Sequence, residues 1–510
     1  GPALLLGLLL GVGGAAGARA PAGGAGGAGG AGGAGGAAGL SLRVGRLAIP
    51  QVDYEPFLSP SGPEGLPVLD LKAVNFGRTV SKEHWAVELE SEHLRAVLLP
   101  EMGRVYSMVN KATGQETLWQ NDVARPGGAN NALGWWLWIG GIEYTLPGQE
   151  HGFTSAMKWG WEVTEDSTER KTVAARVTEP TTGLHEEVAW TLEAGSSALR
   201  TKISITNPHA TDTAHFAHWT NPQWAPGGQN ELTDNTELAM PAKRIVIPER
   251  WQENLGPSPQ DWGTTPLRML RNWEGMGDLM ADGLQGDWYG VYSHDAEEGA
   301  VRVFDRRKTP GIDAWTYGFD PKDVPMGSGK SNKGYAEVWG GTVKTFPDET
   351  APLGPKETLS WTEWIFPFHA TGGLSFANAA LAARADASAG APGEVDIHIC
   401  VCPTRRLAPG AKLAAAAPGG GEVLQTLDLA ASPSEPGRLN LSVGALFDHL
   451  FRSRKVPRPS QTGPCGCRFR PPPRRGSGPG RGIDHARHKL TSGPPRRLGN
   501  PSLHFGLLFY

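Results

Sequence analysis

The feature that most constrains the fold of this 510-residue chain is a long series of short strand-like segments between Val44 and about Phe368. Runs of five to eight residues rich in Val, Ile, Thr and Trp recur there, separated by Gly, Pro, Asn and Asp. Several runs, such as Glu187-Val-Ala-Trp-Thr-Leu, alternate apolar and polar residues, as a strand with one buried face requires. More than ten such strands, with no long amphipathic helix predicted among them, favour a large all-β sandwich or barrel over βαβ units.

The tryptophans indicate where the packed domain lies, because all eighteen fall between Trp85 and Trp364. An indole is a large apolar ring with one donor, and it suits both a core and the flat face of a ligand. The same region contains no cysteine, so its fold does not depend on disulfides. Cys400 and Cys402 are interpreted as plain residues of a strand-like run, and no metal or cofactor site is expected.

Composition divides the chain into parts of different character. The apolar run Leu4–Leu10 followed by Ala18-Arg19-Ala20 fits a secretory signal and is too short to span a membrane. We therefore expect a secreted or lumenal protein without stable membrane insertion, although plastid targeting or plain low complexity stays open. The expected parts are a signal or targeting segment at 1–20, a Gly/Ala linker at 21–39, the β-domain at 40–375, a small, perhaps incomplete β-sandwich at 376–450, and a disordered basic tail at 451–510.

The net charge of −4 hides a split between tail and body. From Phe451 onward there are thirteen Lys and Arg against one acid, so the tail carries +12 and the rest of the chain −16. An acidic body argues against a nucleic-acid binder, because neutralising phosphates needs a basic surface. The tail is either a polyanion-binding arm or an artefact of the gene model, and we favour the artefact.

Motifs in the expected order then suggest a family. They are Leu89–Gly114 with its Pro-Glu-Met-Gly turn, Trp136-Leu-Trp-Ile-Gly-Gly-Ile-Glu143, Gln149-Glu-His-Gly-Phe153, Trp219-Thr-Asn221, Tyr335-Ala-Glu-Val-Trp-Gly-Gly341 and Leu359–Phe368. This set resembles the galactose mutarotase-like (aldose 1-epimerase-like) superfamily, nearest to a bacterial branch of unknown function. The resemblance implies a β-supersandwich of stacked antiparallel sheets with an open carbohydrate cleft on a concave face. Because fold and function separate readily, it does not by itself imply mutarotase activity.

Mutarotation needs a base that removes the anomeric hydroxyl proton and an acid that protonates the ring oxygen. The resemblance implies that the base is a Glu on a late strand and the acid a His. Glu337 stands at the late-strand position, where alternation puts it on one face with Tyr335 and Trp339. His151 stands at the early loop position. The plainer alternatives are an exposed strand glutamate and a surface histidine satisfied by backbone.

The third position departs from the epimerase pattern, which has a His where this chain has Asn221. Asparagine forms hydrogen bonds but cannot shuttle protons at neutral pH. His218 is therefore a third catalytic candidate, with His215 beside it, and it can serve only if the strand bulges. The substrate-binding candidates cluster in the same motifs; they are Arg104, Trp136, Trp138, Glu143, Trp159, Trp219, Asn221 and Trp339.

Three functions remain open for a chain whose expected partner is a mono- or oligosaccharide. The first is an enzyme that uses Glu337 with His151 as an epimerase, or as a lyase in which Arg104 or Asn221 neutralises a uronate. The second is a non-catalytic carbohydrate-binding module that has lost the proton relay. The third is a glycosidase, for which Glu337 and Glu143 are the pair to test. Only the placement of these side chains discriminates among the three.

Overall fold

The computed structural model describes residues 5–11, 39–318, 334–347, 349–391, 394–416, 423–444 and 504–509. The predicted linker at 21–39 and the predicted tail at 451–510 therefore lie almost wholly outside the described residues. The parts expected from composition, including the targeting segment, stay predictions. Within the described ranges, no helix is both long enough and apolar enough to cross a membrane.

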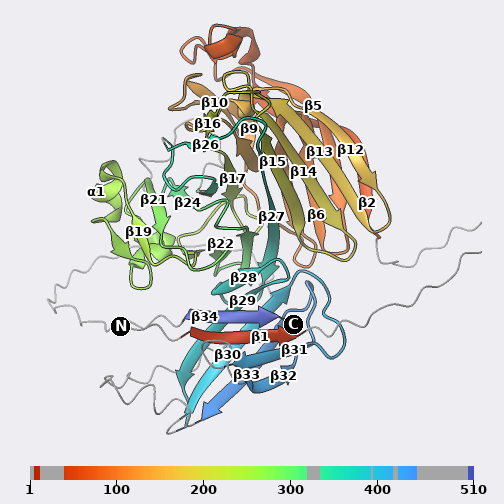
Figure 1. Ribbon diagram of the computed structural model, residues 1–510, viewed down its shortest axis with the longest axis vertical. Coiled ribbons are helices and arrows are strands. Elements are labelled where there is room, and N and C mark those ends of the chain that lie inside the picture. The colour runs from red at the N-terminus through yellow and green to blue at the C-terminus, as the bar shows by residue number, and fades with distance from the viewer. Residues whose placement is uncertain are drawn as a thin grey trace, which may run out of the picture.

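The predicted all-β class is confirmed, and a fourteen-stranded sheet forms the larger half of the main domain (Figure 1). In spatial order its strands are β10 (Trp135–Gly140), β9 (Gln120–Gly128), β2 (Ser41–Val52), β5 (Thr79–Glu90), β6 (Leu94–Leu99), β7 (Arg104–Asn110), β11 (Ile142–Thr145), β17 (Trp219–Trp224), β25 (Ala336–Gly341), β24 (Gly311–Thr316), β21 (Gly277–Asp282), β19 (Arg244–Val246) and β20 (Gln260–Asp261), with β8 (Gln115–Glu116) paired to β7.

An eight-stranded sheet packs against the first to complete the sandwich. Its strands in order are β12 (Gly160–Asp166), β13 (Arg170–Thr178), β14 (His185–Glu193), β15 (Leu199–Thr206), β27 (Thr358–His369), β23 (Glu298–Val303), β22 (Trp288–Ser293) and β18 (Thr236–Ala239). One apolar cluster joins the sheets, with Ile312 and Val338 from the larger and Val188 and Ile203 from the smaller. Alternation along each strand puts these residues on the inner face and leaves the other face of each sheet for a different use.

Two four-stranded sheets lie at the lower end of the sandwich in Figure 1, and all of their strands except β1 follow the sandwich in sequence. One orders β28 (Phe376–Asn378), β29 (Leu381–Ala389), β30 (Glu394–Pro403) and β33 (Gly437–Gly444), and another orders β32 (Val423–Asp428), β31 (Lys412–Ala416), β1 (Leu5–Gly11) and β34 (His504–Phe509). Two-stranded pieces pair β3 (Leu58–Ser59) with β4 (Val68–Leu69) and β16 (Ala214–Phe216) with β26 (Ala351–Leu353).

Helical structure in the described residues is confined to single turns between strands. The α-helical turn is α1 (Gln252–Leu255), and the 3₁₀ turns are η1 (Glu55–Phe57), η2 (Pro63–Gly65), η3 (Pro100–Met102), η4 (Thr154–Ala156), η5 (Glu249–Trp251), η6 (Pro266–Arg268) and η7 (Leu270–Asn272). Cys402 of β30 is a buried free thiol, and Cys400 of the same strand is partly buried.

A buried ion pair stands between the two large sheets. Arg302 of β23 donates through Nε to Glu363 Oε2 at 2.9 Å and contacts the other oxygen of the same carboxylate through Nη2, and both side chains are fully buried. Glu363 also accepts hydrogen bonds from Trp361 Nε1 at 2.7 Å and Thr220 Oγ1 at 3.2 Å, so the pair links β27 to β17. The guanidinium lies so close to β25 that a Cβ added to Gly340 would be 1.9 Å from Arg302 Nη1.

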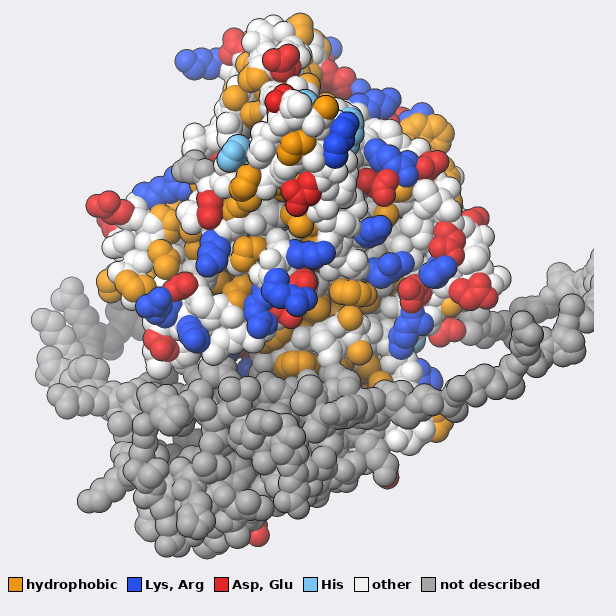
Figure 2. All heavy atoms as spheres, viewed as in Figure 1, with side chains coloured by type: hydrophobic (Ala, Val, Ile, Leu, Met, Phe, Trp, Pro, Cys, Tyr) orange, Lys and Arg blue, Asp and Glu red, His pale blue; other side chains and the backbone are white. Residues whose placement is uncertain are grey.

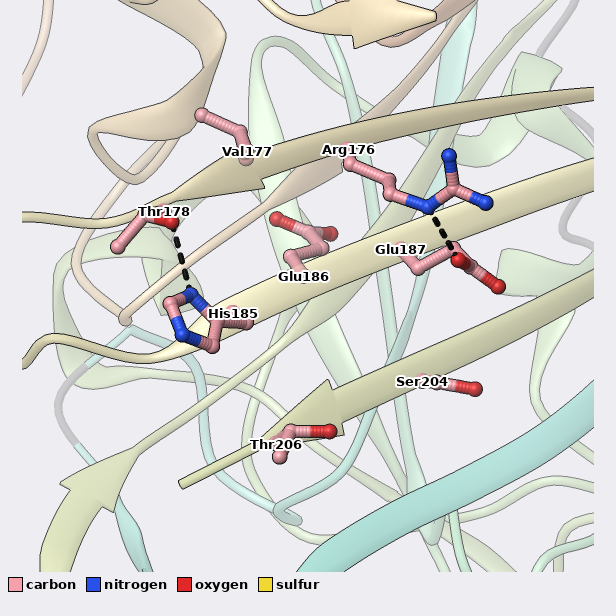
Figure 3. A pocket seen from close by; sticks show the side chains of 8 residues that line it. All are labelled: Arg176, Val177, Thr178, His185, Glu186, Glu187, Ser204 and Thr206. Atoms are coloured by element: carbon pink, nitrogen blue, oxygen red, sulfur yellow. Dashed lines mark hydrogen bonds and ion pairs between the residues drawn. The ribbon is translucent and has the colours of Figure 1, made fainter. Parts of the chain in front are cut away.

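The described surface carries charges of both signs. Lys and Arg side chains are interspersed with Asp and Glu over the face seen in Figure 2. A pocket of about 550 Å³ opens on the outer face of β13–β15, where Figure 3 shows Arg176 paired with Glu187 and His185 with Thr178. Its polar lining residues alternate with residues of the inter-sheet core, so it lies across the sandwich from the fourteen-stranded sheet.

The buried pair gives a first prediction. Replacing Arg302 by Met leaves Glu363 as an unpaired buried charge, which is expected to lower the free energy of unfolding by about 3–5 kcal/mol. The double variant Arg302→Met/Glu363→Leu removes both charges and is expected to recover most of that loss. The measurement is urea unfolding followed by tryptophan fluorescence.

Arg43→Met is the matched control, because the Arg43–Glu88 pair is on the surface, with Arg43 70% exposed. Such a pair contributes only about 0–1 kcal/mol. Equal losses for the two single variants would contradict the structural role given to Arg302.

Candidate functional site

The strand register assembles the candidate site on the outer face of the fourteen-stranded sheet, which we call the site face. Residues directly opposite each other in neighbouring antiparallel strands share a face. The register pairs Glu143 of β11 with Asn221 of β17, and Gln223 of β17 with Glu337 of β25. Their neighbours along the chain, such as Val338, point into the inter-sheet core instead. The site face therefore receives polar side chains from strands that are far apart in sequence.

Glu143 is the charge around which one side of the site is organised. Its carboxylate is 2% exposed, and it accepts a hydrogen bond from Arg104 Nη2 at 2.6 Å and one from Asn221 Nδ2 at 3.3 Å. His151 Nδ1 lies 2.5 Å from Oε1, the same oxygen that accepts from Asn221. Burial raises the pKa of Glu143, but the charges and hydrogen bonds of His151 and Arg104 outweigh it and lower the pKa to about 2. The carboxylate is thus ionised at neutral pH.

His151 sits in a rigid loop after β11. Its backbone has a positive φ of 60°, and the following Gly152 is so close to Leu146 that a Cβ would meet backbone atoms at 2.7 Å. The imidazole stacks on Trp136 with ring centroids 3.7 Å apart and planes 4° from parallel. Burial lowers the pKa of His151, but the contact with Glu143 outweighs it, so the net shift is upward. This shift favours the imidazolium form of the ring, whose Nε2 is the nitrogen not used by Glu143.

Glu337 is the second buried carboxyl of the site face, and its pKa is shifted in the direction opposite to that of Glu143. Its carboxyl accepts hydrogen bonds from Gln223 Nε2 at 3.0 Å and from Trp339 Nε1 at 2.9 Å, and it is 5% exposed. Burial is the largest influence and raises the pKa of Glu337 to about 7, with the nearby negative charge of Glu143 adding to it and His151 opposing it. The Trp339 ring also lies 5.2 Å from the His151 ring, so the acid, the indole and the imidazole are neighbours.

Aromatic rings extend the site face beyond these groups. Trp138 stacks on Trp119 at 5.5 Å between centroids, and Trp119 stacks on Tyr335 at 4.5 Å. The guanidinium of Arg125 lies 4.7 Å from the Trp138 centroid, where burial lowers the pKa of the arginine. The rings form a continuous apolar wall beside the Glu337 carboxyl.

Most of the residues proposed from sequence come together here. The structure brings Glu337, His151, Glu143, Arg104, Asn221, Trp136, Trp138 and Trp339 onto the site face. Trp219 lies on the same face one row away, packed against Phe346 and beneath Gly341. Arg104 is buried, with Nη1 donating to Gly140 O and Nη2 to Glu143, and its Nε has no hydrogen-bond partner.

Two predicted site residues point elsewhere. His218 precedes β17 and turns into the inter-sheet core, where Nε2 lies 3.0 Å from Glu186 and the ring contacts Trp361; it is fully buried there and not brought to Glu337. The bulge that would have turned it to the site face is not present. Trp159 packs into the same core over Gly103 and donates to Thr154 O, so a role in stacking on a ligand is not supported.

Sequence reasoning missed three acidic and amide residues of this face. Gln223 shares a row with Glu337, Asp313 of β24 pairs with Trp339, and Asp278 of β21 pairs with Trp315. The alternation Asp313-Ala-Trp315-Thr-Tyr317 was a usable signal, because it repeats the pattern of an acid and rings on one strand face. No group of three or more His, Cys, Asp or Glu in the described ranges is arranged to hold a metal.

The cleft predicted above this face stays a prediction. Residues 319–333, which connect β24 to β25 beside the site, lie outside the described residues. What the described residues establish is a set of oriented, buried groups rather than the shape of the space above them.

Known proteins share this architecture. Residues 73–367 match the family model described as Domain of unknown function (DUF5107). A TPR-domain containing protein from Parabacteroides distasonis is similar in structure, with a TM-score of 0.54 and 20% identity over 64% of this chain, which spans only 55% of that protein.

Two further solved structures carry mutarotase names. A galactose mutarotase related enzyme from Lactobacillus acidophilus has a TM-score of 0.39 and 14% identity over 56% of this chain and 98% of its own. A galactose mutarotase-like protein from Lactobacillus casei has a TM-score of 0.38 and 14% identity over 55% of this chain and 99% of its own. The match to a family of unknown function agrees with the branch of unknown function that the sequence suggested.

The geometry of Glu143 gives a second prediction. Its pKa in the folded protein, about 2, is below the 4.5 of a free side chain, so its ionic contacts stabilise the fold fully above about pH 4.5. That contribution is lost as the pH falls through about 2. Glu143→Gln cannot titrate, and its free energy of unfolding, relative to its own value at neutral pH, is expected to fall less than that of the wild type over this window.

Urea unfolding at a series of pH values measures this difference. Glu187→Gln, on the outer face of the other sheet, is the control and is expected to keep the acid dependence of the wild type. An unchanged dependence in Glu143→Gln would mean that the Arg104–Glu143–His151 contacts do not stabilise the folded state.

Proposed function

This chain belongs to the DUF5107 family, whose name states no function, and we propose that it binds a sugar over the site face and exchanges protons with it through Glu337 and His151. The product would be the other anomer of the same aldose. The proposal stands on one observation: a buried carboxyl and a buried imidazole on one sheet face are driven to protonation states suited to opposite roles.

The environments of the two groups support that division. The pKa of Glu337 is raised to about 7, chiefly by burial, so a substantial fraction of Glu337 is a carboxylate near neutral pH. A carboxylate with a pKa this high also accepts a proton more readily than an ordinary one. The pKa of His151 is raised through Glu143, which keeps a proton on the imidazole. Pairs of titratable groups with environments that differ in this way are typical of acid–base catalysis.

The reaction then balances within the pair. Glu337 takes the proton of the anomeric hydroxyl while His151 gives its Nε2 proton to the ring oxygen, and the C1–O5 bond breaks to give the open-chain aldehyde. Rotation about C1–C2 presents the other face of the carbonyl. Glu337 returns its proton to the carbonyl oxygen, His151 recovers its own from the O5 hydroxyl, and the ring closes. Trp136 fixes the plane of the imidazole throughout.

The contacts argue against two of the alternatives. A glycosidase would need Glu143 as the second carboxyl, but that group is engaged by Arg104, His151 and Asn221 at once. A lyase would need an uncompensated cation for the uronate carboxylate, and the charge of Arg104 is already paired with that of Glu143 in a buried ion pair. A non-catalytic binding module remains the competing function, and the experiment below separates it from an epimerase.

The test is magnetisation transfer between the α and β anomeric protons of D-glucose and D-galactose by NMR. Wild-type protein is expected to accelerate exchange, with a rate that rises as the pH passes through about 7 and Glu337 ionises. Glu337→Gln is expected to lose about a hundredfold or more of that acceleration, because it cannot accept a proton.

Glu187→Gln and His185→Asn, in the pocket of Figure 3, are matched controls on the far side of the sandwich and should exchange sugars like the wild type. If the sugar signals broaden saturably but the anomers exchange no faster than in buffer alone, the protein is a binding module and not an epimerase. No broadening and no exchange for any aldose would remove both.

A further inference from the structure

A second group of polar atoms on the site face is not used by the Glu337–His151 pair. The carboxyl groups of Asp278 and Asp313 are 3% and 1% exposed, and the Oδ1 atom of each has no hydrogen-bond partner. The nearest cation among the described contacts is Arg250, whose Nη2 is 3.9 Å from Asp278 and whose side chain is 62% exposed. The pair therefore presents buried carboxyl oxygens that the described residues leave without a donor.

Independent atoms on the same face also lack partners. Asn221 and Gln223 are fully buried, and each spends its amide nitrogen on a carboxylate, Glu143 or Glu337. The amide oxygens, Asn221 Oδ1 and Gln223 Oε1, have no hydrogen-bond donor. Leaving a buried acceptor unsatisfied costs free energy, so these atoms indicate a ligand that brings donors.

The register sets the distance between the two acidic groups. Asp278, Trp315 and Glu337 are direct neighbours in one row across β21, β24 and β25. Two strand spacings of about 4.8 Å separate the outer members by about 10 Å at Cβ. Trp315 stands between them, partly exposed. A pyranose ring lying over this indole would reach Glu337 at its anomeric end and the aspartate pair at the opposite end.

We propose that Asp278 and Asp313 form a subsite for a protonated amine carried by the sugar on the side of the ring remote from C1. The inference rests on the function proposed above, because it takes Glu337 as the anomeric end. It narrows the ligand to an amino sugar with the amine at C3, C4 or C6.

An ammonium suits this subsite better than a hydroxyl or an acid. An ammonium has three hydrogen-bond donors and no acceptor. A hydroxyl has one donor, and its oxygen is an acceptor that itself requires a donor. The positive charge of the ammonium favours the ionised form of the two carboxyls, and the Trp315 face attracts a cation. An acidic sugar would place a second negative charge against Asp278, which also feels the charges of Asp313 and Glu150.

Matched sugars that differ only at C6 test this directly. The probes are 6-amino-6-deoxy-D-glucose, D-glucose and D-glucuronate, with D-glucosamine to place the amine next to C1 instead. Dissociation constants are measured by calorimetry at neutral pH on the full chain. The 6-amino sugar is expected to bind about tenfold or more tightly than glucose, as a hydrogen-bonded charge warrants, and glucuronate more weakly than glucose.

Asp313→Asn is the decisive variant, because an amide replaces a carboxyl of the same shape without its charge. It is expected to abolish the preference for the 6-amino sugar while leaving glucose affinity within about twofold. Asp386→Asn, on β29 of the smaller sheet, is the control and should keep the preference. An amine preference that survives in Asp313→Asn, or none in the wild type, overturns the inference.

The outcomes separate this inference from the function on which it rests. If the protein accelerates anomer exchange of glucose but does not prefer the amino sugar, the epimerase activity is supported and the amine subsite is contradicted. Amine preference that depends on Asp313, without anomer exchange, would support the subsite in a binding protein.

Discussion

Everything proposed for this protein depends on the antiparallel register of a few short strands in its larger sheet. Side chains alternate with a period of two, so a slip by one residue between β17 and β25 would exchange the site face for the core face. If β25 were the strand that slipped, Glu337 would enter the apolar layer and Val338 would face outward. The continuous inter-sheet core makes such a slip costly, and in this way packing on one side of the sheet fixes chemistry on the other.

Two glutamates show how far the surroundings decide what a carboxyl group can do. Glu143 and Glu337 are both buried on the same face, yet their pKa values shift in opposite directions. Burial raises the pKa of Glu337, whereas ionic contacts lower the pKa of Glu143. The difference lies in their partners: Glu143 faces two cationic side chains, and Glu337 faces neutral donors from Gln223 and Trp339. The fixed charge of Glu143 then acts on both members of the catalytic pair.

The sequence was sufficient for local features and insufficient for those made between distant strands. Alternation within Tyr335–Trp339 predicts the common face of Glu337 and Trp339, and the hydrogen bond between them agrees. Orientation at a strand end is not set by alternation, and so His218 was expected on the wrong side. The Asp278–Asp313 pair was missed because the partners are on separate strands and meet only through a pairing that no single segment encodes.

The close approach of Arg302 to Gly340 has a consequence for how this protein could change its ligand. The core-facing side of β25 cannot accept a larger residue at Gly340, because a single added carbon would collide with the Arg302 guanidinium, which Glu363 holds in place. Its front is restricted at Gly341, where an added carbon would meet Trp219, but Glu337 and Trp339 project from it. Side chains at these two alternate positions could thus be exchanged while the scaffold behind them stays unchanged.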